Sequence, residues 1–177
     1  KFLIENFIEP YHVQFVHKTT TNQPLKDHYT FVDGKCYGSG VDVEQEDEKN
    51  YNALSVTSRY LSLFPNFIMG TYYPNQVGVY LNIPISPGIT SQKRIIYTID
   101  NKVMTKKEIQ ATKDIWWSVH KEDHEMCERL QEGRSSPASN NGGLLSPVWE
   151  KGVQAFQKLI INSIRKSFKM TRRVKNV

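Results

Sequence analysis

Residues 28–43 read HYTFVDGKCYGSGVDV, two runs of alternating apolar and polar residues on either side of Asp33-Gly34. An Asp-Gly pair between alternating runs is a strong signal for a β-hairpin, because glycine adopts the positive φ of a tight turn. β-Branched and aromatic residues continue through residues 59–86, where two Pro-Asn pairs predict turns, and residues 92–100 predict one more strand. The middle of the chain is therefore predicted to form an antiparallel sheet.

Helical patterns flank this block of strands. Residues 2–17 are apolar on nearly every side and predict a buried helix, which Pro10 disturbs. From Lys106 the apolar spacing becomes helical as far as Gly133, which is typical of a helix end, and an amphipathic helix is predicted over about 147–168. A helix, a set of strands and two further helices predict an α+β fold.

The composition is that of a globular protein, and its charge is unevenly placed. The 177 residues fit one domain, with 38% hydrophobic and 23% charged residues and a net charge of +5. Five acidic residues fall within 42–48 and six basic residues within 165–175. Such runs usually lie on a solvated loop or tail, and the functional alternative for the basic run is docking of an acidic partner protein. No interleaving of arginine with aromatic residues supports nucleic-acid binding.

The two cysteines, Cys36 and Cys127, have no ligand-like spacing, which argues against a disulfide framework and indicates a reducing, cytoplasmic compartment. No apolar run reaches the roughly 18 residues of a membrane span, and no signal peptide is visible. The chain does not begin with Met and opens inside a helical pattern, so we expect it to be part of a longer polypeptide.

The first predicted helix carries ionisable side chains that burial does not tolerate without compensation. Its segment ENFIEPYHVQFVH (5–17) includes Glu5, Glu9, His12 and His17. Burying such groups costs several kcal/mol unless they are paired or bind a cation. On an ideal helix, residues five apart such as His12 and His17 project about 140° apart. They can therefore bind one ion only if the helix is irregular or ends between them.

A carboxylate on the helix predicted from Lys106 is also out of place. In a helical projection Asp123 falls about 80° from Ile115, inside an apolar stripe that contains Leu130 and Trp116. A buried carboxylate usually caps a backbone group or pairs with a base, and the alternative is that it binds a metal with imidazoles from elsewhere. Two imidazoles and one carboxylate match the facial triad of non-haem Fe(II) oxygenases. The lack of sulfur ligands disfavours structural zinc.

Three stretches of the sequence resemble one known family. ENFIEPYHVQFVH (5–17) resembles the Glu-x-x-His-x₄-His motif of the catalytic domain of Rieske non-haem iron oxygenases, the ring-hydroxylating oxygenase α subunits. EDHEMCERLQEG (122–133) resembles the downstream segment in which an aspartate completes the ligand set, and LFPNFIMGTYYPNQVGVYLNIPISPGIT (63–90) resembles the Phe-Pro-Asn strand region. The resemblance covers essentially the whole chain, and Glu9 with the ED…CE…Q pattern is closer to the carnitine and choline monooxygenase branch.

The resemblance implies that His12, His17 and Asp123 bind Fe(II), that Glu9 passes electrons from the Rieske [2Fe–2S] centre of a neighbouring subunit, and that Asn6 supports them. It implies a helix-grip (START/Bet v1-like) fold, a homotrimer, and a ferredoxin or reductase as electron donor. The implied activity is mono- or dioxygenation of a small organic substrate with O₂, as in aromatic compound catabolism.

The cysteine and histidine motif of the Rieske cluster is absent from residues 1–177. The chain is therefore expected to be the mononuclear-iron catalytic domain, with the Rieske domain preceding residue 1. On its own it is expected to lack an electron source and to be incapable of sustained turnover.

Aromatic and polar residues of the strands and of the helix from Lys106 are candidates for the substrate pocket, although each also fits an ordinary core position. The pocket candidates are Phe67, Met69, Tyr80, Asn82 and Trp116. Candidates for an aromatic cage around an amine cation are Tyr72, Tyr73 and Trp117.

Two other classes of function stay open from the sequence. HKEDH at 120–124 places two histidines at i and i+4, as in zinc hydrolases, but its acid is Asp and no third ligand follows at a recognisable spacing. A metal-free carrier of lipids or other hydrophobic ligands also fits a helix-grip cavity. That carrier would leave His12, His17 and Asp123 buried without a cation.

Overall fold

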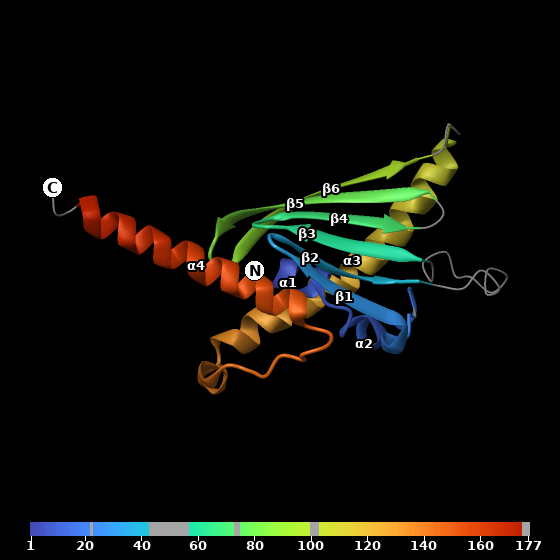
Figure 1. Cartoon of the computed structure of the whole chain (residues 1–177). Helices are drawn as coiled ribbons and strands as arrows, with labels where there is room; N and C mark the ends of the chain where they lie inside the picture. Colours follow the sequence, from blue (N-terminus) through green and yellow to red (C-terminus); the bar gives the residue numbers. More distant parts are fainter. Residues whose placement is uncertain (22, 43–56, 73–74, 100–102, 175–177) are drawn as a thin grey trace.

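A six-stranded antiparallel sheet with strand order β1-β2-β3-β4-β5-β6 forms the centre of the computed structural model (Figure 1). The structure describes residues 1–21, 23–42, 57–72, 75–99 and 103–174, with residues 169–174 described as backbone only. The strands are β1 (His28–Asp33), β2 (Cys36–Val41), β3 (Ser58–Leu63), β4 (Phe67–Tyr72), β5 (Gln76–Ser86) and β6 (Ile89–Thr98). The α+β class and the antiparallel sheet are confirmed.

Two turns of the sheet lie at turn residues that the sequence predicts. β1 and β2 are joined by Gly34 and Lys35, and Gly34 has a φ of 57°, which a residue with a side chain rarely adopts. The Pro-Asn pair at 65–66 lies between β3 and β4. β6 begins at Ile89, earlier than the predicted start at residue 92, because its pairing with β5 continues past Ile83 as far as Ser86.

The prediction of one helix over residues 2–17 is wrong. The segment forms α1 (Phe2–Ile8) and the four-residue helix α2 (Val13–Val16), with an extended residue between them. That residue is Glu9, with φ −110° and ψ 139°. The ring of Pro10 clashes with a helical conformation at the residue before it, so the chain leaves the helix one residue before the proline.

The later helices also extend differently from their predicted limits. α3 (Lys106–Ser135) continues past Gly133 and ends at Ser135, and the cap residue Ser136 is extended because Pro137 follows it. A short 3₁₀ helix, η3 (Pro137–Asn141), follows α3. Another, η1 (Leu25–Asp27), precedes β1. α4 (Lys151–Val174) starts four residues later than predicted and runs past residue 168.

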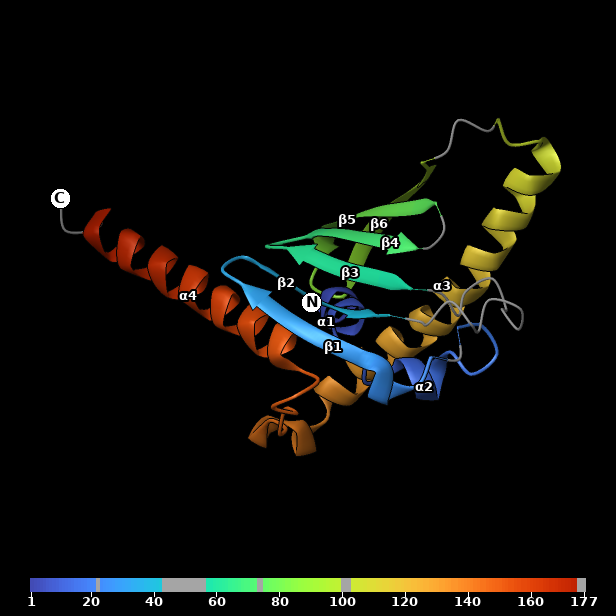
Figure 2. The ribbon, with the colours of Figure 1, turned by 45° about the vertical axis from the view of Figure 1, so that its right-hand side comes forward.

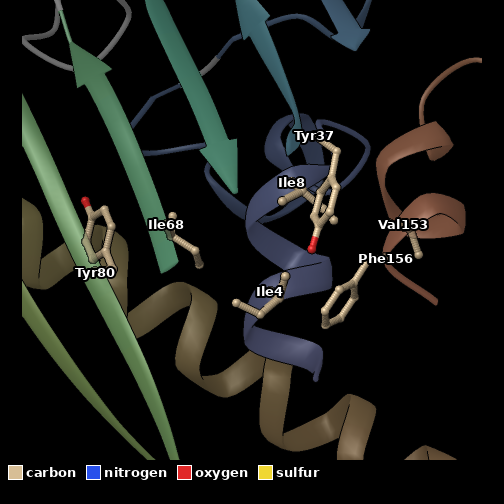
Figure 3. Close-up of a cluster of buried hydrophobic side chains, with 7 residues drawn as sticks. All are labelled: Ile4, Ile8, Tyr37, Ile68, Tyr80, Val153 and Phe156. Carbon is tan, nitrogen blue, oxygen red and sulfur yellow. The ribbon is translucent and has the colours of Figure 1, made fainter. Parts of the chain in front are cut away.

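α1 contacts α3, α4, β2 and β3, and α4 also packs directly on β1 and β2. The central cluster of buried side chains comes from α1, three strands and α4 (Figure 3): Ile4, Ile8, Tyr37, Ile68, Tyr80, Val153 and Phe156. α3 crosses below the sheet, and α4 follows its β1 edge and then extends past it (Figures 1 and 2). This arrangement fixes residues 1–17 between the sheet and α3.

The charged runs are only partly described. Of the acidic run, Asp42 forms an ion pair with Arg59, and residues 43–48 lie outside the described part of the chain. In the basic run Arg165 and Lys166 are exposed, and the side chains from residue 169 onward lie outside it. The docking role of the basic run stays a prediction. None of the described helices is long and apolar enough to cross a membrane.

Candidate metal centre

Three side chains from two distant segments meet at one point. His12 and His17 flank α2, and Asp123 comes from the middle of α3. The Nε2 atoms of His12 and His17 lie 3.6 and 3.1 Å from Asp123 Oδ1. One donor atom of each residue lies within 4.8 Å of the others, and within the described ranges this is the one such group of three. The predicted ligands are therefore in place to share one ion.

The break in the first helical segment allows this convergence. α2 ends at Val16, and His17 leaves the helix with φ −93° and ψ 39°. The imidazoles of His12 and His17 consequently face each other edge to face, with ring centroids 5.2 Å apart. The irregularity that the five-residue spacing requires is confirmed.

A carboxylate orients each imidazole from behind. Glu9 Oε1 lies 2.8 Å from His12 Nδ1, and Glu122 Oε2 lies 2.7 Å from His17 Nδ1. A carboxylate accepts hydrogen bonds, so each Nδ1 carries a proton. Without an ion, His17 Nε2 donates to Asp123 Oδ1 over 3.1 Å, and a bound ion would take the lone pair of each Nε2 in place of a proton. Carboxylate–histidine–metal arrangements of this kind fix the tautomer and raise the basicity of the metal ligand.

Both orienting carboxylates are held in turn by the chain around them. Glu122 accepts hydrogen bonds from the hydroxyls of Thr19 and Thr20, at 3.1 and 2.8 Å. Glu9 accepts from the backbone N–H of Tyr11 and of His12, the latter at 3.1 Å. Glu122 was not among the candidates from the sequence.

The remaining buried polar groups of α1 have separate partners. Asn6 Nδ2 donates to Asp123 Oδ1 over 2.8 Å, which fixes the carboxylate that faces the histidines. Glu5 accepts from Gln157 over 2.8 Å and forms an ion pair with Lys1 at 2.6 Å. Asn6 therefore belongs to the centre, and the charge of Glu5 is compensated away from it.

The centre favours a positive charge between its carboxylates. Burial lowers the pKa of His17, but hydrogen bonds and charges from Asp123 and Glu122 outweigh this and raise it. Burial raises the pKa of Asp123, but the hydrogen bond from His17 and the charge of His12 outweigh this and lower it. The same carboxylates would stabilise a bound cation.

The three predicted ligands line a cavity of about 50 Å³ that also has an aromatic wall. Of the predicted pocket residues, Tyr80 and Trp116 line it, whereas Phe67, Met69 and Asn82 do not. Phe67 and Met69 belong to the alternate positions of β4, because Ile68, Gly70 and Tyr72 are the buried ones. Asn82 is buried but bonds to Asn66 and Gln92.

The wall consists of packed, neutral rings. Tyr72 packs against Trp116 with ring centroids 4.3 Å apart and the ring planes tilted by 53°, and its hydroxyl lies 3.1 Å from that of Tyr80. Burial raises the pKa of Tyr60 to about 12 and also raises the pKa of Tyr72 and Tyr80. Phenols in this state exclude water without adding charge.

A wider groove of about 870 Å³ between β6 and α3 adjoins the cavity, and Arg94 and Trp116 line both. Trp117 lines this groove with 68% of its surface exposed, whereas Tyr72 lines the inner cavity. Tyr73 lies outside the described residues. The three proposed members of an amine cage are thus not brought together by the described part of the chain.

The histidines of HKEDH do not form a second centre. His124 is exposed and pairs with Glu128 at 3.1 Å, and its ring centroid lies 6.4 Å from that of His120. Burial, with the charge of Arg94, lowers the pKa of His120 to about 4. Cys36 and Cys127 are unpaired thiols, and burial raises the pKa of Cys127 to about 12. The sequence pattern for a zinc hydrolase is therefore not supported by the geometry.

Two imidazole nitrogens and one carboxylate oxygen form the facial triad of mononuclear non-haem iron oxygenases, and both imidazoles have the carboxylate partner that such ligands need. The donor set therefore fits Fe(II). Residues 1–165 match the model of the ring hydroxylating alpha subunit (catalytic domain) family, and the chain belongs to this family.

Similar proteins point to one branch. The chloroplastic choline monooxygenases of Amaranthus tricolor and Atriplex hortensis are 28% and 27% identical to the chain over 160 and 158 residues. Each alignment covers 88% of this chain, which spans about 35% of the length of these relatives. The quaternary ammonium Rieske monooxygenase CntA, solved with L-carnitine, shares the fold with a TM-score of 0.67 at 17% identity, over 90% of this chain and 44% of that one.

Proposed function

We propose that the chain is the mononuclear-iron catalytic domain of a Rieske-type monooxygenase, with Fe(II) held by His12, His17 and Asp123. The convergence of two Nε2 atoms and one carboxylate oxygen beside an aromatic cavity carries this proposal. Iron in such a site supplies O₂ activation for hydroxylation of a C–H bond of a small organic substrate. The names of the relatives favour monooxygenation over dioxygenation of an aromatic ring.

The chain's own residues prepare the site. Glu9 and Glu122 hold the histidine tautomers, and Asn6 fixes the orientation of Asp123 through its 2.8 Å hydrogen bond. The ring wall keeps water away from the three ligands. The groove between β6 and α3 is wide enough for a small substrate, because ligand pockets measure about 300–1,000 Å³.

Electron supply is the part of the proposal that lies beyond these residues. A Rieske [2Fe–2S] centre of a neighbouring subunit in a homotrimer would deliver electrons through Glu9, with a ferredoxin or reductase as donor. Glu9 suits this role because its carboxylate contacts His12 directly. Electron transfer between subunits has been described for CntA, which shares the fold. A helix-grip classification and a cytoplasmic location belong to the same proposal.

Metal analysis of the chain tests the proposal. After anaerobic reconstitution with Fe(II) and dialysis, we expect one iron per chain, retained in His120→Ala and His124→Ala because neither side chain contacts the triad ligands. Tight zinc that is lost in those two variants would favour the hydrolase. Absence of metal together with a bound lipid would favour the carrier, although the inner cavity of about 50 Å³ is small for one.

Glu9→Gln tests the electron path in the full-length protein. The amide retains an oxygen that accepts from His12 Nδ1, so metal affinity should fall by about 10–100-fold and saturating Fe(II) should restore the iron content. Product formed per bound iron should then be lower by at least about tenfold, because the charge of Glu9 is lost. Product and iron are measured on the same samples, with the exposed Glu125→Gln as control. Wild-type product formation in Glu9→Gln contradicts the bridging role.

A further inference from the structure

The guanidinium of Arg94 lies where the inner cavity meets the outer groove. Arg94 lies on β6, directly opposite Tyr80 of β5 in the sheet register. Along this stretch of β6 the half-buried positions alternate with exposed ones, and Arg94 is on the side that faces α3. It lines both the cavity beside the triad and the adjoining groove. A molecule that reaches from the groove to the triad must pass its guanidinium.

The guanidinium is held in place from one side only. Its Cζ lies 4.5 Å from the ring centroid of Tyr80, and its Nε donates to Gln92 Oε1 over 2.8 Å. Gln92 is itself fixed by a 2.7 Å hydrogen bond to Asn82. This leaves the two terminal nitrogens of Arg94 without a hydrogen bond to any described residue. They form the planar fork that binds a carboxylate with two parallel hydrogen bonds.

No acidic side chain of the described residues forms an ion pair with Arg94. The other charged residues of the groove are Lys113 and Asp114, whose charges cancel. Burial and the charge of Arg94 lower the pKa of His120 to about 4, so this neighbour is neutral at physiological pH. Among the described residues that line the groove, Arg94 is therefore the one charge without an opposite charge beside it, and the carboxylates of the inner cavity, Glu9 and Asp123, pair with the histidines.

We propose that Arg94 binds a carboxylate of the substrate, and that this contact places the carbon to be hydroxylated in the inner cavity beside the triad. The part of this inference that places the reacting carbon of the substrate beside the triad rests on the proposed function. The contact between Arg94 and a carboxylate does not itself require iron. It narrows the substrate class to acids, including zwitterions that carry an ammonium and a carboxylate.

The same contact disfavours a substrate that is only cationic. An ammonium group on the aromatic wall would lie near a guanidinium that already occupies the face of Tyr80. Without a carboxylate to neutralise Arg94, the two like charges repel in a poorly hydrated site. Choline, which has no carboxylate, is therefore expected to be a poorer ligand than γ-butyrobetaine.

Matched pairs of ligands test this contact by isothermal titration calorimetry, on the chain with and without Fe(II), under nitrogen. The pairs are γ-butyrobetaine with its methyl ester, and benzoate with benzamide. One member of at least one pair should bind, and the acid should bind about tenfold or more tightly than the partner that lacks the carboxylate. Arg94→Gln should remove this preference, and Arg94→Lys should keep part of it because a single charge remains.

Lys93→Gln is the matched control, because it removes the same charge from the neighbouring, exposed position of β6. It should leave the preference unchanged. The proposal is overturned if the acid and the partner that lacks the carboxylate bind with equal affinity, or if none of the four compounds binds. It is also overturned if Arg94→Gln leaves the preference unchanged, or if Lys93→Gln lowers it as much as Arg94→Gln does. If Arg94→Gln fails to fold, Arg94→Lys replaces it in the test. Arg94→Lys should bind the acid more weakly than the wild type does, and an unchanged affinity overturns the proposal.

Iron content of the same samples separates this inference from the proposed function. Iron bound at the triad with no preference for acids overturns the role of Arg94 alone. A preference for acids in a chain that fails to bind iron overturns the proposed function and leaves the anion contact standing.

Discussion

Asp123→Ala is expected to abolish stoichiometric iron binding by the chain. The substitution removes the one carboxylate that faces both Nε2 atoms, at 3.6 and 3.1 Å, and leaves two imidazoles that cannot neutralise a divalent cation. Iron is measured after anaerobic reconstitution and dialysis. Glu125→Ala is the control, because it removes an exposed carboxylate from the same helix. Wild-type iron content in Asp123→Ala would show that the ion lies elsewhere.

A graded effect is expected from the carboxylate behind His17. Glu122→Gln keeps an oxygen that can accept from Nδ1 but loses the charge that makes the imidazole more basic. Loss of such a partner weakens metal binding by about 10–100-fold. Competition with a chelator of known affinity measures this. An affinity equal to wild type would leave Glu122 without a role in the centre.

The largest loss of stability is expected from Gly38→Ala. A Cβ at this position of β2 would overlap the backbone carbonyl oxygen of Tyr60 and lie 2.9 Å from its carbon. Neither atom can move without displacing β3, which is paired to β2 through Leu61. Overpacking of a core costs about 1–3 kcal/mol and more where backbone must shift, so we expect the free energy of unfolding to fall by at least about 3 kcal/mol.

Gly133→Ala is the matched control for that measurement. A Cβ at Gly133 meets nothing within 4 Å, and the residue lies inside α3. Alanine is the better helix former, so stability should rise by about 0.5–1 kcal/mol. Denaturant unfolding of both variants gives the comparison. A similar loss in the two variants would mean that helix and sheet glycines are equally constrained.

Local chemistry made most of the sheet predictable. The hairpin of β1 and β2 follows from Asp33-Gly34, and the turn between β3 and β4 from Pro65-Asn66, because these residues restrict φ within one or two positions. Helix limits were harder. The projection treated residues 2–17 as one ideal helix, although the steric effect of Pro10 on Glu9 ends α1 at Ile8. Pro10 therefore gave better information than the apolar pattern around it.

The site was predictable where two signals coincided. His12, His17 and Asp123 stood out as ionisable groups in apolar surroundings, and the family resemblance joined segments that no local pattern connects. Glu122 was not predicted, although in the projection it falls about 20° from Ile115, at the edge of the apolar stripe and on the opposite side of Ile115 from Asp123. A charged residue beside an apolar stripe is a weaker signal than one within it.

Pocket residues were the least predictable part. Tyr80 and Trp116 line the cavity, but Phe67 and Met69 occupy the other face of β4, because successive side chains of a strand point to opposite faces of the sheet. Sequence alone does not say which of the two sets faces α3. Arg94 was not predicted for a related reason. Only the position of β6 shows that its terminal nitrogens form no hydrogen bond to a described residue.

The pairing of α2 with α3 has a consequence for the folding of the whole chain. His17 and Glu122 are 105 positions apart, and every strand of the sheet lies between them. An ion held by His12, His17 and Asp123 would thus cross-link the chain and close a loop around the entire sheet. By analogy with a disulfide that closes about 100 residues, the chain-entropy contribution reaches about 4–5 kcal/mol. Iron starvation would then yield a protein that unfolds and is degraded sooner, in addition to one that is inactive.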